Sequence, residues 1–241
     1  MSESSIPITR SIDGQLSNEE RRILTECILQ TKPTVVIEVG TWLGGGSTLH
    51  ILRALHQNGK GRLWGIESDR DVYERLLVNL RNAAPEAIDR FTPLFGLSQE
   101  VLPHWIAGEG SGLSVDVAFL DGGDQPQEQI TEFELLDPLI PVGGHLFAHD
   151  ARMRKGKWFV PFLSRLDHWK TEVLDSSEVG LLSAVKRAAQ PSPASRTDAE
   201  ALRKQFRRAP VEMVGRLLPN SVKKAVLRIL PHRLFRAIYR G

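Results

Sequence analysis

Hydrophobic residues recur along this chain with two alternating spacings. Short apolar runs of the kind found in buried strands occupy residues 35–37, 62–67, 91–95, 114–120 and 145–148. Between these runs, apolar residues recur every three or four positions, as on one face of a helix, and residues 71–83 and 128–139 are examples. The alternation predicts the α/β fold class, with a doubly wound, mostly parallel, Rossmann-like sheet.

One more helix is predicted before the first strand. Ser17 and Glu20 have the spacing of a capping box, and the apolar face that follows extends to about Gln30. Cys27 lies on this face, which favours a small core residue over a reactive thiol. Because Cys27 is the only cysteine, the sequence also excludes an internal disulfide and a cysteine-based zinc cluster.

The end of the sheet is predicted to be antiparallel. After a helical pattern at 158–166, two strand patterns at 169–174 and 180–185 are separated only by a short acidic turn. Strands joined without a helix indicate an antiparallel pair at the sheet edge. We therefore predict four regions: an N-terminal helical segment 1–33, a core 34–187, a linker 188–197 and a basic, amphipathic helical tail 198–241.

Charge divides the chain into two parts. Residues 201–241 carry eleven Lys and Arg against one Glu, a net charge of +10, which leaves −8 for residues 1–200. A cationic amphipathic tail can lie on an anionic membrane surface, pack against an acidic body or a second copy in a homodimer, or bind nucleic acid, the least favoured partner. No signal peptide and no apolar stretch of about 18 residues occurs, so we expect a cytoplasmic protein that the tail could hold at the inner membrane surface.

A glycine-rich turn follows the first strand. Gly40 and Gly44 come shortly after Glu38, and such glycines let the backbone approach a ligand at the carboxyl end of a strand. A dinucleotide fingerprint would need a second glycine where the chain has Trp42. A phosphate-binding P-loop would need a lysine before Ser47, where a glycine stands. The turn therefore matches neither fingerprint.

Polar side chains stand where the predicted strands end. Glu67 ends the second strand, where a carboxylate can accept hydrogen bonds from both hydroxyls of a ribose, and Asp69 is the next candidate. Asp121 ends the fourth strand, and His149 and Asp150 follow the fifth. In a doubly wound sheet, such strand ends line one crevice.

Five motifs occur in order between residues 16 and 187. They are E-x-G-x-x-x-G from Glu38, the strand-end acid Glu67, G-x-S-x-E from Gly96, V-D-x-x-F-L-D-G-G from Val115 and L-x-P-x-G-G-x-x-x-x-H-D from Leu139. Together they resemble the class I S-adenosylmethionine (SAM) dependent methyltransferases, and among these the small-molecule O-methyltransferases of the catechol and caffeoyl-CoA type with their bacterial relatives. The resemblance implies SAM as cofactor, O-methylation of a small hydroxylated metabolite and, in the metal-dependent members, an Mg²⁺ ion.

The resemblance also assigns residues to SAM. Cofactor binding is implied for Glu38, Gly40, Thr41, Gly44, Glu67, Ser98 and Asp121. Of these, the first four lie at the methionine end and Glu67 would hold the ribose. Ser98, or Gln99 beside it, would contact the adenine, with a plain helix cap at Ser98 as the alternative.

The acceptor side is implied to contain Asp121, His149 and Asp150. Asp121 and Asp150 match two metal ligands of the metal-dependent members, and His149 is a candidate general base, with a structural histidine as the alternative. The chain departs from the catechol-type Asp-Asn pair, since it has His149-Asp150, and a hard Mg²⁺ ion prefers oxygen to imidazole. The glycine turn is also one residue longer than the family pattern, which leaves Gly45 and Gly46 without an assigned contact.

Two further features bear on function. Methyltransferases that act on nucleobase amines usually carry an Asn/Asp-Pro-Pro-aromatic run after the fourth strand, and this chain has Asp121-Gly122-Gly123-Asp124 there, which favours an oxygen acceptor. The cations that follow Asp150 indicate an anionic acceptor or, more simply, a solvated face: Arg152, Arg154, Lys155 and Lys157. The alternative from another class is a SAM-fold binding or tethering protein without turnover, whose basic tail contacts a membrane or nucleic acid.

Overall fold

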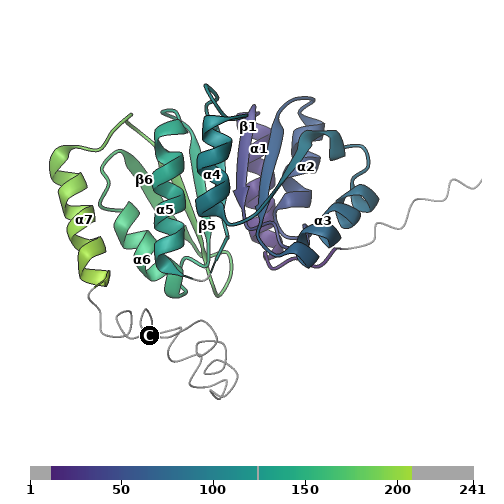
Figure 1. The fold of residues 1–241 in the computed structure, drawn as a ribbon. Coiled ribbons are helices and arrows are strands. Elements are labelled where there is room, and N and C mark those ends of the chain that lie inside the picture. Colours follow the sequence, from purple (N-terminus) through teal and green to yellow (C-terminus); the bar gives the residue numbers. More distant parts are fainter. Residues whose placement is uncertain (1–11, 124, 208–241) are drawn as a thin grey trace, which may run out of the picture. The chain divides into compact units, whose positions relative to one another are not determined.

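The computed structural model describes residues 12–123 and 125–207 (Figure 1). The described residues form two compact units, one that ends at Gly122 and one that begins at Gly123. The predicted fold class is confirmed, with a mostly parallel seven-stranded Rossmann-like sheet that has an antiparallel edge. Among the described residues, every helix is too short or too polar to cross a lipid bilayer.

The first unit holds four parallel strands in the order β3-β2-β1-β4. The strands are β1 (Val35–Val39), β2 (Arg62–Glu67), β3 (Phe91–Phe95) and β4 (Val117–Leu120). The helices are α1 (Asn18–Thr31), α2 (Thr48–Gln57), α3 (Arg70–Ala83), the 3-10 turn η1 (Ile88–Arg90) and α4 (Ser98–Ala107). Figure 1 shows helices on both faces of these strands, as in a doubly wound sheet.

Strand β1 lies at the centre of the first unit. All five of its residues are buried, and it pairs on one side with β2 and on the other with β4. A parallel strand covered by helices on both faces is expected to be apolar throughout, and β1 departs from that pattern only at Glu38. The central position places the glycine turn in the middle of the carboxyl edge of these four strands.

Helix α1 begins as predicted. Ser17 and Glu20 form the reciprocal capping box, and Leu24 and Ile28 are buried on the inward face. Burial raises the pKa of the Cys27 thiol to about 11, so the thiolate is scarce at neutral pH. Cys27 itself is only half-buried, beside the core rather than in it, so the structure supports the low reactivity of its thiol and not its predicted place in the core.

Strand β4 is shorter than predicted. The apolar pattern indicated a strand from residue 114, but the ladder begins at Val117. The Asp116 carboxylate instead accepts hydrogen bonds from the backbone N–H groups of Thr34 and Val35, at 2.6 and 3.0 Å. The Asp116 side chain therefore satisfies the backbone N–H groups at the start of β1.

The second unit holds an antiparallel set of strands in the order β5-β7-β6. The strands are β5 (His145–His149), β6 (Trp169–Leu174) and β7 (Leu181–Lys186), and the predicted antiparallel edge pair is confirmed. The helices are α5 (Pro126–Leu136), the 3-10 turn η2 (Asp137–Leu139), α6 (Arg154–Leu163) and α7 (Pro193–Arg207).

Three helices of the second unit differ from their predicted bounds. Helix α5 begins at Pro126, because Gln125 and Glu128 form a capping box, and its predicted last residues form η2. Helix α6 was predicted over 158–166 but spans Arg154–Leu163. Helix α7 begins within the predicted linker 188–197.

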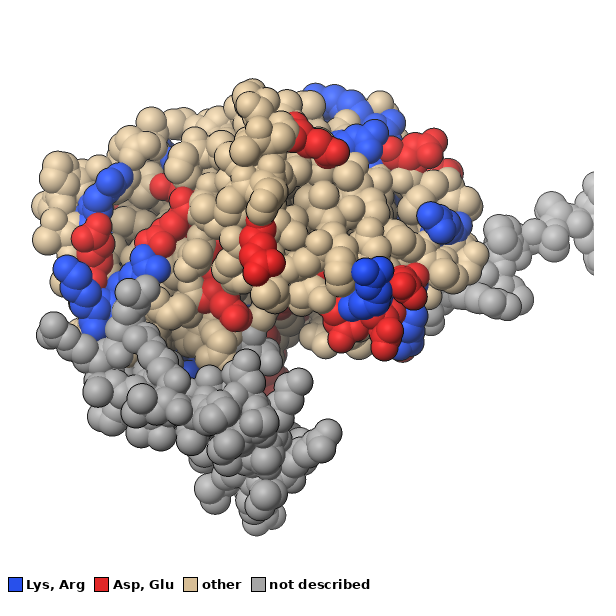
Figure 2. Space-filling view, in the orientation of Figure 1, with Lys and Arg blue, Asp and Glu red and all other residues tan. Residues whose placement is uncertain are grey.

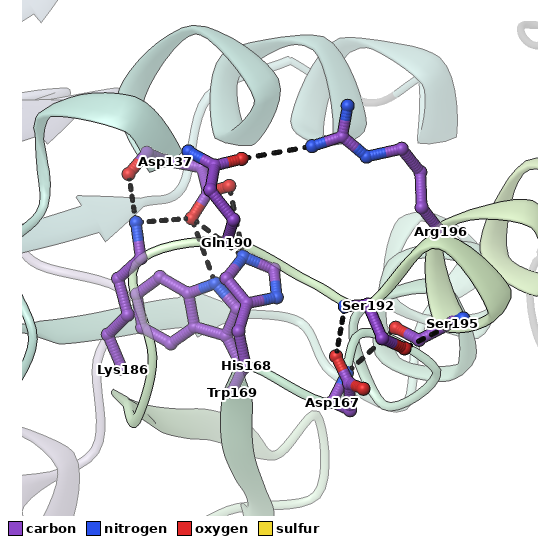
Figure 3. A network of polar contacts seen from close by, with 9 residues as sticks. All are labelled: Asp137, Asp167, His168, Trp169, Lys186, Gln190, Ser192, Ser195 and Arg196. Atoms are coloured by element: carbon purple, nitrogen blue, oxygen red, sulfur yellow. Dashed lines mark hydrogen bonds and ion pairs between the residues drawn. The ribbon is translucent and has the colours of Figure 1, made fainter.

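A polar network around Asp137 joins η2 to β6 and β7 (Figure 3). The Asp137 carboxylate contacts the buried side chains of His168 and Lys186, at 3.1 and 2.9 Å, and accepts from the indole N–H of Trp169 at 3.0 Å. Burial alone would raise the pKa of Asp137, but the hydrogen bonds from His168 and Lys186 hold it below its usual value. The network fixes the edge pair of the second unit to the end of α5.

Helix α7 is attached to the second unit at both ends. Near its start, Asp167 accepts from the Ser192 backbone N–H at 2.9 Å, and the Ser195 hydroxyl accepts from the Asp167 backbone N–H at 3.0 Å (Figure 3). Near its end, the rings of Trp158 and Phe206 stack with centroids 4.8 Å apart. The predicted linker is therefore held against the unit, which its Pro- and Ser-rich composition did not indicate.

Most of the predicted basic tail, residues 208–241, lies outside the described residues. The surface that is described has a mixed charge. Figure 2 shows Lys and Arg side chains interspersed with Asp and Glu on the face in view. The predicted contacts of the tail with membrane, nucleic acid or a second copy are therefore not addressed by this structure.

Candidate active site

The glycine turn has the backbone geometry that its composition predicts. Gly40 has φ +86°, and a Cβ atom there would stand 2.4 Å from the carbonyl oxygen of Asp121. Gly44 has φ +88°, and its Cβ would meet Leu76 at 2.8 Å. Gly40 therefore requires glycine for conformation and for space, and Gly44 requires it for conformation. Gly40 also brings the ends of β1 and β4 together, since the Asp121 N–H donates to Val39 at 2.8 Å.

The carboxylate of Glu67 is held in place by the backbone around it. Its Oε2 accepts from the Trp42 N–H at 2.9 Å, and its Oε1 accepts from the N–H groups of Ser68 and Asp69 at 2.9 and 3.0 Å. Trp42 reaches this position with φ +46°, which is uncommon for a bulky residue. Oε2 keeps a lone pair, so Glu67 can still accept a hydrogen bond from a ligand hydroxyl through that oxygen.

Glu38 is fully buried beneath the glycine turn. The hydroxyl of Ser47 donates to its Oε1. Burial raises the pKa of Glu38 to about 8, against the opposing hydrogen bond from Ser47, and the nearby carboxylates of Asp121 and Glu67 add to the rise. At neutral pH, Glu38 is therefore mostly protonated.

Two buried polar atoms at this turn point to a polar ligand. Within the described part of the chain, Glu38 Oε2 and the hydroxyl of Thr41 make no well-aligned hydrogen bond, although the side chain of Thr48 also interacts with the Glu38 carboxyl. A buried polar atom without a partner costs about 1–3 kcal/mol, so native proteins seldom leave one unless a ligand or water completes it. The cradle thus fits a ligand that carries hydrogen-bonding groups.

Local geometry bears on two alternatives from the sequence: Asp69 as a second candidate for the ribose carboxylate, and Ser98 as a helix cap. The Asp69 side chain accepts from the Val72 N–H at 3.0 Å and so caps α3, which leaves Glu67 as the strand-end carboxylate that faces the turn. Ser98 is the first residue of α4 and is buried, whereas the cap position is Leu97 and carries no side-chain cap bond. Ser98 is therefore not a plain helix cap, and its contact with adenine stays a prediction.

The two glycines without an assigned contact border the N-terminal segment. A Cβ at Gly45 would stand 2.2 Å from the carbonyl oxygen of Ile12, and one at Gly14 would stand 2.3 Å from the backbone of Gly45. A Cβ at Gly46 would stand 3.8 Å from the Cα of Gly14. These glycines therefore make room for residues 12–14, which the sequence did not indicate.

The predicted acceptor residues of the second unit, His149 and Asp150, lie close to Lys155. Asp150 follows β5 with φ +60°, and its Oδ2 lies 3.0 Å from Lys155 Nζ. Its Oδ1 lies 3.5 Å from Nδ1 of His149, a side chain only 4% exposed. Lys155, expected on a solvated face, is buried instead, with a side chain 6% exposed. Asp121 belongs to the first unit.

The chain matches a known family over the residues that carry this geometry. Residues 37–151 match a family model described as a methyltransferase domain. This stretch is similar to methyltransferase domains. It runs from β1 to the residue after Asp150, and it includes the glycine turn, Glu67 and Ser98. A comparison with curated protein sequences found no match to the chain.

Solved structures share the fold of the methyltransferase domain and its flanks. An O-methyltransferase from Bacillus cereus, in complex with S-adenosylhomocysteine (SAH), is 19% identical with a TM-score of 0.62, over 72% of this chain and 83% of that chain. TomG from Streptomyces achromogenes, an O-methyltransferase involved in tomaymycin synthesis and in complex with SAM, is 19% identical with a TM-score of 0.61, over 72% and 82%. A methyltransferase from Geobacter sulfurreducens is 20% identical with a TM-score of 0.58, over 72% and 81%.

Proposed function

We propose that this protein is a SAM-dependent methyltransferase that transfers the methyl group to an oxygen of a small hydroxylated molecule. The observation that carries the proposal is the fixed carboxylate of Glu67 beside a glycine cradle, within a methyltransferase domain. Similar structures in complex with SAM or SAH support the choice of cofactor. That two of these similar proteins are O-methyltransferases supports oxygen as the acceptor atom.

The residues of the first unit are proposed to hold SAM. Glu67 would accept hydrogen bonds from the ribose hydroxyls, and Ser98 would border the adenine. The methionine end would lie in the cradle of Gly40 and Gly44, where Thr41 and Glu38 offer buried polar atoms that make no well-aligned hydrogen bond within the described residues. When bound, SAM supplies a methyl group on a sulfonium, whose carbon–sulfur bond breaks as the acceptor oxygen attacks.

The residues at the acceptor side would manage the proton of the acceptor hydroxyl. His149 is the proposed general base, because an imidazole can take a proton near neutral pH. Asp121 is proposed to contact SAM and to take part in catalysis. Asp150, whose Oδ1 faces His149, is placed to orient the imidazole and to stabilise its protonated form.

The magnesium site predicted from Asp121 and Asp150 fits the local structure poorly. An atom of His149 and an atom of Asp150 are close enough to bind one ion, within 4.8 Å. However, the group of candidate donors includes the imidazole of His149 beside the carboxylates, and the Asp150 carboxylate is already paired with the Lys155 ammonium. We therefore propose no step that uses Mg²⁺.

A panel assay separates this proposal from the alternative of a SAM-fold protein without turnover. The full chain would be incubated with SAM and a panel of small phenols, catechols and aliphatic alcohols, and SAH release would be measured. SAH formation that depends on an acceptor supports the enzyme, and the His149→Ala variant should lose most of it. Tight SAM binding without SAH release from any hydroxylated acceptor would favour the binding protein.

A further inference from the structure

A buried lysine is paired with one of the predicted acceptor-site carboxylates. Lys155 Nζ lies 3.0 Å from Asp150 Oδ2, and the lysine side chain is far less exposed than the aspartate, 6% against 28%. A buried ammonium is strongly disfavoured unless it is paired, so this contact is a requirement of the fold at this point. The pair also occupies one oxygen of Asp150 with a positive charge.

The chain is shaped so that Lys155 turns back onto Asp150. The Met153 N–H donates to the Asp150 carbonyl at 2.9 Å, and helix α6 begins one residue later. A Cβ at Gly156 would stand 2.3–2.4 Å from the backbone oxygens of Ala151 and Asp150, so only glycine allows so tight a turn. Asp150 itself has the left-handed conformation, with φ +60°.

The position of Lys155 runs against an ordinary helix preference. The first turn of α6 holds cations and no acidic residue, although the N-terminal end of a helix favours negative charge. A residue that breaks a local rule and is also buried is expected to serve the site rather than the helix. The contact with Asp150 compensates for the unfavourable position of the Lys155 charge at the N-terminal end of the helix.

The same contact acts against a divalent cation at Asp150. An ion bound through Asp150 would lie within a few ångströms of the Lys155 ammonium, and the two positive charges would repel each other at a site largely shielded from water. The neighbouring donor, His149, is an imidazole, which Mg²⁺ binds poorly. Both features disagree with the magnesium site of the metal-dependent O-methyltransferases that the sequence resembles.

We infer that the Lys155 ammonium, fixed on Asp150, supplies the positive charge that a metal ion would otherwise supply beside the acceptor oxygen, so that methyl transfer needs no divalent cation. This inference rests on the proposed function. Lys155 is a positioning residue, because it acts through its contact with Asp150 and through the electrostatic field of its charge at the acceptor oxygen. It keeps its proton throughout.

The test is a titration with Mn²⁺, a paramagnetic substitute for Mg²⁺ whose free concentration is read by electron paramagnetic resonance. The full-length wild-type protein should show no saturable Mn²⁺ binding, with or without SAH. The Lys155→Met variant keeps the aliphatic stem and removes the charge, and it should bind one Mn²⁺ at least about tenfold more tightly than the wild type. The double variant Lys155→Met with Asp150→Asn should lose that gain.

Lys157→Met is the matched control, because Lys157 is an exposed lysine in the same helix turn. It should behave as the wild type. Saturable Mn²⁺ binding by the wild type, lost on Asp150→Asn, would overturn the inference, and that result stands even if a Lys155 variant fails to fold. Absence of any gain in a folded Lys155→Met protein would overturn it as well. SAH affinity measured on the same samples reports on the proposed function separately.

Discussion

The backbone N–H of Trp42 donates to Oε2 of Glu67 at 2.9 Å and so joins the glycine turn after β1 to the carboxylate that ends β2. The other oxygen of Glu67 is held by the N–H groups of Ser68 and Asp69. The carboxylate is therefore oriented before any ligand arrives, which lowers the entropy cost of ordering it on binding. This arrangement makes Glu67 the residue on which cofactor binding should depend most.

Gly40 should tolerate no side chain. The Gly40→Ala variant places a Cβ 2.4 Å from the Asp121 carbonyl at a positive φ, so we expect it to lower the free energy of unfolding by about 2–4 kcal/mol and to weaken SAH binding. Urea unfolding and calorimetry measure the two effects. Gly59→Ala is the control, since Gly59 also has a positive φ (+69°) but has open space around it, and it should cost only about 1 kcal/mol. Equal losses in the two variants would contradict the role given to the close contact.

Glu38 should make stability depend on pH. Its pKa is about 8 in the folded protein and near 4.5 in an exposed carboxyl, so between these values the folded state binds more protons than the unfolded state. The free energy of unfolding should therefore fall as pH rises from about 5 to 8, by at most about 1.4 kcal/mol per pH unit.

Urea unfolding across that pH range measures the slope. The Glu38→Gln variant keeps an oxygen that can accept from Ser47 and cannot ionise. Its unfolding free energy should decline clearly less than that of the wild type. Parallel curves for the two proteins would show that Glu38 is ionised in the folded state at neutral pH.

Asp137 should be essential to the stability of the second unit. Asp137→Asn leaves the ammonium of Lys186, whose side chain is 2% exposed, without its carboxylate partner, and we expect a loss of about 3–5 kcal/mol. The control is Asp175→Asn, since Asp175 is 92% exposed and its contact with Arg152 lies at the surface, where the expected loss is below about 1 kcal/mol. Chemical unfolding measures both, and similar small losses would show that the network is not a stabilising unit.

The basic tail should act independently of the cofactor. Removing residues 208–241 leaves all of helix α7 and should leave SAH affinity unchanged, while binding to vesicles that contain phosphatidylserine should be lost. Vesicles of phosphatidylcholine alone are the control and should bind neither protein. Vesicle binding that survives the truncation would rule out the tail as the membrane contact.

The sequence predicted the fold because its signals are local. Strands β2, β3 and β6 match the apolar runs residue for residue, and the capping box at Ser17 marked the start of α1. The errors occur where a side chain distant in sequence decides the structure. Asp116 is one case, since its carboxylate caps the start of β1, 81 residues away, and shortens β4.

The candidate site could be predicted only in outline. Glu67 could be predicted as a site residue because it ends a strand. Its hydrogen-bond partner Trp42 could not, because Trp42 lies 25 residues away and donates through its backbone N–H, which depends little on residue type. Lys155 was placed on a solvated face because runs of cations are usually exposed, and only the turn at Gly156 returns it to Asp150. Spacing within a motif indicates chemistry, whereas burial and pairing depend on the tertiary fold.

The most direct test of the central claim is calorimetric titration of the full chain with SAH, beside Glu67→Ala and the control Glu74→Ala, which alters an exposed carboxylate on α3. We predict micromolar binding by the wild type and by Glu74→Ala, and a loss of at least about tenfold in Glu67→Ala. Failure of the wild-type protein to bind SAH, or undiminished binding by Glu67→Ala, would contradict the SAM site proposed here.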